Sequence, residues 1–298
     1  MRLFPAINEA GPGFGLALLL VSMTTTQIGS AAAKFLFVEV GPTVAVALRL
    51  IVATLLLFLA LRPWRNVPKG KAWRSVAVYG LSIAVMNAVF YQAIARIPLG
   101  IAVTLEFSGP LFVAVISSRR WTDYAAVALA VLGLLLLFPW SGLAEGGASL
   151  DITGMLFALT AAFFWGAYII FGRRAGGSAG SGAAAWGMLI GTAAILPWAL
   201  VESGGVLVPA HQMADVLPLA LFVGFMASAL PYGLEIMALR IVPPQVYGVL
   251  MSLEPGAAAL FGFLILGEVL SLFQWAAIVC VIAASLLVSL GGRGAEGN

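Results

Sequence analysis

Long apolar segments separated by short polar turns dominate the pattern of this chain of 298 residues. An α-helix needs about 20 mostly apolar residues to cross the hydrocarbon core of a bilayer. Segments that meet this requirement predict an all-α membrane protein whose ten transmembrane helices span residues 13–33, 42–61, 73–95, 99–117, 124–138, 152–171, 182–200, 216–239, 243–266 and 272–290. The turns between them are too short to hold a separate soluble domain.

Composition agrees with a chain that uses lipid as its solvent. Hydrophobic residues make up 62% of the sequence, charged residues 9%, and the mean hydropathy is +1.08. A soluble domain carries about 25% charged residues. The net charge of +3 is too small to indicate a nucleic-acid partner. Membrane lipid is therefore the expected surroundings, and the sequence indicates no oligomeric state beyond a monomer or a homodimer.

Several kinds of chemistry have no support in the sequence. The single cysteine excludes a disulfide within the chain, and the single histidine, His211, falls in a predicted outer loop. No phosphate-binding glycine-rich loop with a following lysine is present, so ATP is not expected to drive the protein. The aspartates nearest the spans fall close to predicted helix ends, which argues against an intramembrane enzyme. We expect no catalytic residue, metal or cofactor.

Lysine and arginine residues predict the orientation in the membrane. If the N-terminus is cytoplasmic, twelve of the fifteen fall in cytoplasmic segments, two fall outside, and Arg49 lies within a span. Short cytoplasmic loops of membrane proteins are rich in these residues. We therefore expect a multi-pass protein of a bacterial inner membrane with both termini in the cytoplasm. The alternation of charge also supports the number of spans.

The two halves of the chain, residues 13–138 and 152–290, repeat the same succession of features. In each half the fourth helix begins at a proline and later carries a glutamate followed by a second proline, as in Glu106 with Pro110 and Glu254 with Pro255. Five helices per half is an odd number, so the second half must be inverted relative to the first. Inverted repeats with interrupted helices are typical of secondary transporters. The alternative is a repeat that only builds a scaffold.

Four sequence strings carry a family resemblance. They are PLGIAVTLEFSGP at 98–110, ALPYGLE at 229–235, LMSLEP at 250–255 and LGE at 266–268. Together they resemble the EamA-type transporters of the drug/metabolite transporter superfamily, in particular the bacterial threonine/homoserine exporters and the related aromatic amino-acid exporters. The resemblance extends from about residue 15 to residue 290. It implies an amino-acid exporter whose third, fourth, eighth and ninth helices line a central cavity, assisted by the first and sixth.

Ionisable side chains at membrane depth cost about 2.5–3.5 kcal/mol each on insertion scales, so each one needs a reason. Glu106 and Arg49 both lie seven residues from the predicted outer end of their helices, and matching depths allow a buried ion pair. Such a pair either locks two helices together or leaves Glu106 to bind a substrate amine or a proton. Pro110 removes the hydrogen bond to the carbonyl of Glu106 and predicts a helix break there.

The second half offers a similar arrangement. Pro255 predicts a break beside Glu254, and Met251 shares a helix face with this glutamate. A buried glutamate that only packs between helices is the alternative. Glu235 and Tyr232 share a face of the eighth span, although Glu235 is close enough to the predicted cytoplasmic end to reach water.

Polar and aromatic side chains complete the predicted cavity wall. Asn87 and Tyr91 share a face of the third span, and ordinary hydrogen bonding between helices is their alternative use. Lys34 lies near the outer end of the first span and could form a gate with Arg49 and Glu235, or extend to water. The full set of substrate-binding candidates is Gln27, Asn87, Tyr91, Glu106, Trp165, Tyr168, Tyr232, Met251 and Glu254.

The function that these features predict is export of small amino acids of the threonine and homoserine kind by alternating access. A coupled proton or the solute gradient alone would drive it. The alternative is a transporter of the same superfamily for another class of solute, such as organic cations, purines or nucleotide sugars. Aromatic residues beside a carboxylate, such as Trp165 and Tyr168 with Glu254, would suit an organic cation.

Overall fold

The protein is described here by a computed structural model, which covers residues 12–65, 67–116, 121–137, 151–179, 182–238, 242 and 244–291. Within these residues the secondary structure is entirely helical. The α-helices and one π-helix that build the fold are α1 (Pro12–Leu61), α2 (Ala72–Ile94), α3 (Leu99–Glu106), α4 (Ser108–Ile116), α5 (Trp121–Leu137), α6 (Ile152–Ala179), α7 (Gly182–Glu202), α8 (Met213–Gly224), the π-helix η4 (Phe225–Ala229), α9 (Leu230–Ala238), α10 (Pro244–Met251), α11 (Glu254–Leu266) and α12 (Leu272–Gly291). Two short 3₁₀ turns, η2 (Pro63–Arg65) and η3 (Ala210–Gln212), lie in the connections.

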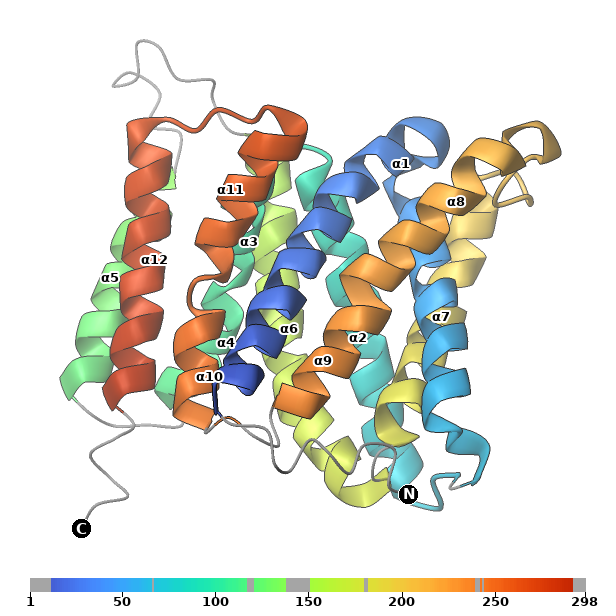
Figure 1. Cartoon of the computed structure of the whole chain (residues 1–298), viewed down its shortest axis with the longest axis horizontal. Coiled ribbons are helices and arrows are strands. Elements are labelled where there is room, and N and C mark those ends of the chain that lie inside the picture. The colour runs from blue at the N-terminus through green and yellow to red at the C-terminus, as the bar shows by residue number, and fades with distance from the viewer. Residues whose placement is uncertain are drawn as a thin grey trace.

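Seven of the described helical segments are long and apolar enough to cross a membrane, and shorter apolar helices accompany them at Leu99–Val113 and Tyr124–Leu137. Figure 1 shows these helices side by side, with α5 and α12 at one edge of the molecule and α7 and α8 at the other. The α2 helix packs against α6, α3 packs against α11, and the first helix contacts α7, α8, η4 and α9. The prediction of an all-α membrane protein is confirmed.

The first two predicted spans form one assigned helix, α1, with a kink at Gly41. Gly41 has φ 74° and ψ 162°, a conformation that glycine adopts without the steric penalty of a side chain. The residues between the two spans, 34–40, are helical rather than a loop. Lys34 has partners inside the protein, described below, so its charge does not require the helix to end.

Three helices are interrupted at membrane depth. Phe107 separates α3 from α4, Ser252 and Leu253 separate α10 from α11, and η4 widens the turn between α8 and α9. The two predicted helix breaks are present, but each lies just before its proline. Pro110 and Pro255 sit in the first turns of α4 and α11, where a missing backbone N–H leaves no hydrogen bond unmade. The interruption at η4 was not predicted.

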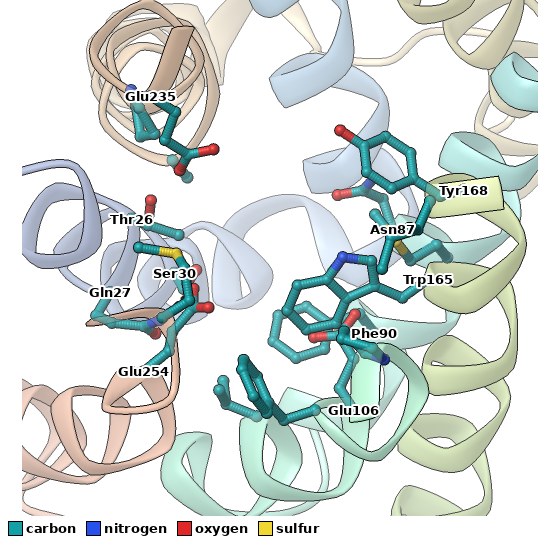
Figure 2. A pocket seen from close by; sticks show the side chains of 18 of the residues that line it. Thr26, Gln27, Ser30, Asn87, Phe90, Glu106, Trp165, Tyr168, Glu235 and Glu254 are labelled. Atoms are coloured by element: carbon teal, nitrogen blue, oxygen red, sulfur yellow. Dashed lines mark hydrogen bonds between the residues drawn. The ribbon is translucent and has the colours of Figure 1, made fainter. Parts of the chain in front are cut away.

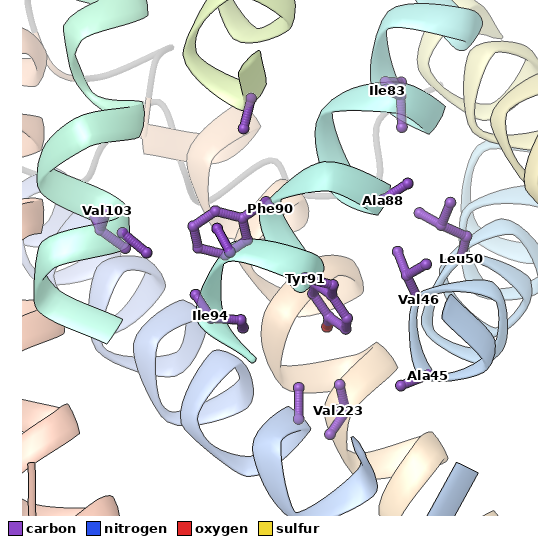
Figure 3. Close-up of a cluster of buried hydrophobic side chains, with 14 of the residues drawn as sticks. Ala45, Val46, Leu50, Ile83, Ala88, Phe90, Tyr91, Ile94, Val103 and Val223 are labelled. Atoms are coloured by element: carbon purple, nitrogen blue, oxygen red, sulfur yellow. The ribbon is translucent and has the colours of Figure 1, made fainter. Parts of the chain in front are cut away.

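A buried apolar core holds the helices together. Figure 3 shows part of it, where Leu50 and Val46 from α1 meet Ile83, Ala88 and other residues of α2. Small residues allow helix backbones to approach closely: a side chain added at Gly100 would lie 2.6 Å from the Cα atom of Ala259. Close packing of small residues is a common way for helices to associate in membranes.

Candidate functional site

A cavity of about 380 Å³ lies among the helices, within the size range of small-molecule sites. Residues of α1, α2, α3, α4, α6, η4, α9, α10 and α11 line it. Both helix interruptions that precede a proline adjoin this cavity, because Phe107 and Pro110 line it at one and Met251 and Glu254 at the other. Irregular backbone at membrane depth is tolerated where it lines such a cavity.

A glutamine and a glutamate meet on one side of the cavity, as Figure 2 shows. The Nε2 group of Gln27 donates a hydrogen bond to Oε1 of Glu254 at 3.3 Å. Gln27 is only 1% exposed, and its own Oε1 atom has no hydrogen-bond partner among the described residues. A buried acceptor without a donor is costly, so this oxygen marks a place where a donor from a ligand would be favoured.

A second glutamate, Glu235, also lines the cavity. Its carboxylate accepts hydrogen bonds from the Ser22 hydroxyl at 2.9 Å and from the Tyr247 hydroxyl at 3.5 Å. Glu235 and Glu254 are close enough to interact electrostatically. The two donors direct the partly exposed carboxylate of Glu235 toward α1 and α10.

Glu106 is the last residue of α3 and lies across the cavity from Gln27 in Figure 2. It is 8% exposed, and its carboxyl group has no hydrogen-bond donor among the residues that the structure describes. It interacts electrostatically with Glu254 and with Arg49. The cavity therefore gathers three carboxyl groups and a single guanidinium group, counted over its described lining residues.

The predicted ion pair between Arg49 and Glu106 is not present in the described part of the chain. Arg49 instead donates through Nε to the Ser228 hydroxyl at 2.8 Å and through Nη2 to the carbonyl of Ala227 at 2.9 Å. Both acceptors belong to η4, which the sequence did not reveal. Depth along two helices predicts that two side chains are level with each other, but not that they face each other.

Aromatic rings form another part of the cavity wall (Figure 2). The rings of Phe107 and Trp165 meet edge to face with centroids 5.6 Å apart, and Phe90 lies near them. The ring of Tyr168 stacks on the ring of Tyr79, with the two centroids 5.1 Å apart, and this contact helps to fix the orientation of Tyr168. Apolar ring faces combined with a few polar groups are typical of sites for small organic molecules.

Most of the remaining predicted residues can be placed. Asn87 and Met251 line the cavity, and the Asn87 amide donates to the carbonyl of Ile83 at 2.9 Å. Tyr91 does not line the cavity, because it is completely buried in the core shown in Figure 3. The Cζ atom of Arg49 lies over its ring. The side chain of Tyr232 lies outside the described residues.

Lys34 is also away from the cavity. Its ammonium group pairs with the carboxylate of Glu268 and donates to the carbonyl of Ile97 at 3.2 Å. Lys34 thus has neither Arg49 nor Glu235, its fellow candidates for a gate, as a partner among the described residues.

Several lining residues were missed by the sequence analysis. Thr26 and Ser30 are one helical turn apart beside Gln27, and Met86 and Phe90 flank Asn87 in the same way. A spacing of three from Gln27 and from Asn87 would have found Ser30 and Phe90, and a spacing of four back from these two reaches Thr26 and Met86.

A bundle of apolar helices around a cavity, with interrupted helices beside it, is typical of membrane transport proteins. The chain belongs to the EamA-like transporter family, whose model matches residues 13–138 and 152–290. It is therefore a multi-pass membrane transporter of the inner membrane and not an enzyme.

Curated relatives include exporters. The chain is 42% identical over 271 residues to the threonine/homoserine exporter RhtA of Escherichia coli (strain K12) and to that of Salmonella typhimurium (strain LT2), which covers 91% of this chain and 90% of each exporter. Protein PecM of Dickeya dadantii is 26% identical over 264 residues, covering 83% of this chain and 82% of that protein. A crystal structure of an 18% identical protein matches the fold with a TM-score of 0.62, covering 94% of this chain and 99% of that one.

Proposed function

We propose that this protein is a secondary transporter that exports small amino acids, with threonine and homoserine as the first candidates, by alternating access. The observation that carries the proposal is the buried, unpartnered Oε1 of Gln27 beside the carboxylate of Glu254 in the cavity. The identity of 42% to exporters with that printed specificity, over nearly the whole chain, supports the choice of substrate.

The proposed site would hold the ammonium group of an amino acid between Gln27 and Glu254. An ammonium group offers three donors and no acceptor, which suits an amide oxygen and a carboxylate together. The charge-assisted hydrogen bond to Glu254 would be the stronger of the two. The aromatic side of the cavity, with Trp165 and Phe107, would then face the carbon atoms of the solute.

The proposed topology is ten membrane crossings in two inverted repeats of five helices, residues 13–138 and 152–290, with both termini in the cytoplasm. The kink at Gly41 would turn α1 back across the membrane. Helix interruptions at corresponding places in the two halves, Phe107 and residues 252–253, support the repeat. Fusion of a fluorescent protein that folds only in the cytoplasm to the C-terminus tests this topology, and a dark fusion at normal abundance would contradict it.

Proton coupling is the proposed driving force, with the solute gradient alone as the alternative. Glu106, Glu235 and Glu254 lie close enough for Glu254 to interact electrostatically with each of the other two. Three carboxyl groups with one guanidinium group favour the entry of positive charge, which either a proton or a substrate ammonium supplies. Exchange of the two during the transport cycle would couple their movements.

The decisive experiment is transport of labelled threonine by the purified protein in liposomes, with and without an imposed pH gradient. We expect uptake above empty liposomes, accelerated by a gradient of the correct sign. The Thr160→Val variant serves as a matched control, because Thr160 is exposed on the outer face of α6 away from the cavity. If neither threonine nor homoserine crosses above the background of empty liposomes, the proposed function is wrong.

One observation favours a second candidate, an exporter of organic cations. Trp165 and Tyr168 present aromatic rings in the same cavity as Glu254, and such rings attract cations. Competition against labelled threonine separates the two, because a cation exporter would be inhibited by a quaternary ammonium compound more strongly than by unlabelled threonine.

A further inference from the structure

Arg49 is the cation of the cavity, and it is held on one side only. It comes from the second half of α1, lines the cavity, and donates through Nε and Nη2 to Ser228 and Ala227. A guanidinium group has five N–H donors in a planar fork. These two bonds leave three donors, including both on Nη1, and the hydroxyl of Tyr91 lies close enough to interact with the group.

The acceptors are supplied by an irregular piece of helix. In the π-helix η4 the backbone N–H of Leu230 bonds to the carbonyl of Phe225, five residues back. Pro231, just after this turn, has no N–H to donate to the carbonyl of Ala227, so that carbonyl is available to Arg49, which also bonds the Ser228 hydroxyl. Single π-helical turns are frequent at functional sites. The irregularity thus has an observable consequence, which is a fixed guanidinium group.

Tyr91 supports Arg49 from the protein side. The Cζ atom of Arg49 lies 5.3 Å from the centroid of the Tyr91 ring, and this tyrosine is completely buried. A cation over an aromatic ring is stabilised by the ring's electrons. Tyr91, which the sequence suggested as a substrate-binding residue, is in this arrangement a positioning residue for Arg49.

No carboxylate of the described chain pairs with Arg49. Salt bridges within the described residues join Lys34 to Glu268 and Arg96 to Asp151, while Glu106 reaches Arg49 only through longer-range attraction. A charged side chain within a membrane segment is costly unless a partner or water satisfies it. The free edge of the guanidinium group therefore favours an anionic partner inside the cavity.

The backbone that holds the guanidinium group packs against the first half of α1, which supplies Gln27 and Ser30 to the cavity. Ala227, whose carbonyl bonds Arg49, packs so closely on α1 that a side chain added at Gly29 would lie 2.6 Å from the Ala227 nitrogen. Gly29 lies between Gln27 and Ser30, which both line the cavity. Arg49 and the unpartnered oxygen of Gln27 thus belong to residues that line the same cavity.

We propose that Arg49 binds the carboxylate of the transported solute, so that the cavity recognises both ends of a zwitterion. This inference rests on the proposed function and deepens it. A planar guanidinium fork matches the two oxygens of a carboxylate, while Glu254 and Gln27 receive the ammonium group. The cavity would then discriminate against amines that lack a carboxylate, whatever their side chain.

The test compares two ligands that differ in one group. Binding of threonine and of threoninol, in which an alcohol replaces the carboxylate, is measured on the purified full-length protein by equilibrium dialysis. The wild-type protein is expected to bind threonine roughly 10-fold to 100-fold more tightly, the range of one charge-assisted bidentate contact. Comparable affinities for the two ligands would overturn the inference while leaving amino-acid transport standing.

Variants then assign the discrimination to Arg49. In Arg49→Gln we expect threonine to bind roughly as weakly as threoninol, while the affinity for threoninol stays within about twofold of wild type. Arg49→Lys retains the charge but loses the planar guanidinium fork. Its affinity for threonine should therefore lie between that of the wild type and that of Arg49→Gln. Undiminished preference for threonine in Arg49→Gln would overturn the assignment.

Two further outcomes are distinguishable. If Arg49→Gln does not fold, Tyr91→Leu, which removes the supporting ring and its hydroxyl, is expected to reduce the preference for threonine by a smaller factor. An unchanged preference there counts against the inference. If the wild-type protein neither binds nor transports threonine or homoserine, the proposed function itself fails, and the inference fails with it.

Discussion

The carboxylate of Glu268 lies against the ammonium group of Lys34, and it also accepts the backbone N–H of Leu99 at 2.7 Å. This side chain, two residues beyond the end of α11, thus joins that end to the first helix and to the start of α3. Gly267 makes this reach possible, because its φ of 67° ends α11 in the left-handed conformation that favours glycine. Pro98, the residue before α3, provides no side-chain cap of its own.

The first prediction concerns the stability of this junction. Glu268→Gln keeps an acceptor for the Leu99 N–H but loses the charge, so we expect a loss of about 1–3 kcal/mol in the free energy of unfolding. Glu268→Ala loses both and should cost more. Unfolding of the purified protein in detergent mixtures measures the difference. Equal losses in the two variants would show that the cap on α3 contributes nothing.

The second prediction concerns the close contact of α3 with α11. A Cβ atom at Gly100 would lie 2.6 Å from Cα of Ala259, so Gly100→Ala must push the two helices apart, at a cost of about 1–3 kcal/mol. Gly176→Ala is the matched control in α6, where an added Cβ meets nothing within 4 Å. It should be neutral or slightly stabilising, because alanine favours helix. A stable Gly100→Ala protein would contradict the packing.

The third prediction concerns Glu254. Its replacement by glutamine preserves size but removes the charge that would hold a substrate ammonium group. A charge-assisted hydrogen bond contributes about 1.5–3 kcal/mol, so the KM for threonine should rise by at least roughly tenfold. Uptake by liposomes containing equal amounts of folded protein measures it. The Thr160→Val control should keep the wild-type KM. If Glu254→Gln also keeps it, Glu254 has only a packing role.

The fourth prediction concerns Glu106, whose carboxyl group has no hydrogen-bond donor among the described residues. Because it is not required to satisfy another protein group, Glu106→Gln should be expressed and folded at normal levels. We expect a marked change in the response of transport to an imposed pH gradient, since a charge in the cavity is lost. Transport identical to wild type, with and without the gradient, would assign Glu106 a structural role only.

The fifth prediction concerns the aromatic wall. Trp165→Phe keeps an aromatic edge against Phe107, which lies 5.6 Å away between ring centroids, and should retain most transport. Trp165→Ala removes a large apolar surface and opens the cavity, so the KM for threonine should rise while bulkier amino acids compete better. A set of competing amino acids of increasing size measures this shift. An unaltered order of competition would contradict contact between Trp165 and the solute.

Periodicity and hydropathy predicted the helices well because lipid leaves few other structures available to a chain this apolar. The glutamates could be identified for a related reason, since each ionisable residue inside an apolar span requires an explanation. Glu106 and Glu254 both line the cavity, as does Gln27.

The failures have a common physical origin. Arg49 and Tyr91 were assigned from position along a helix, whereas their partners depend on how helices are rotated about their axes. The π-helical turn at Phe225–Ala229 contains no proline or glycine to indicate it. Pro231, however, has no N–H to bond the carbonyl of Ala227 four residues back, so the rule applied to Pro110 would have indicated this acceptor of Arg49. Lys34 pairs with Glu268, which follows a helix end far along the chain.

The junction at Glu268 has a consequence for biosynthesis. Leu99 and Glu268 are separated by 169 residues, so α3 emerges from the ribosome long before the group that caps its first N–H exists. Ala259, against which Gly100 of α3 packs, also arrives late. Contacts between distant residues form slowly, since the intervening chain must first be ordered. The first half, made alone, would therefore contain an unfinished α3, and the cavity can take shape only when nearly the whole chain has been synthesised.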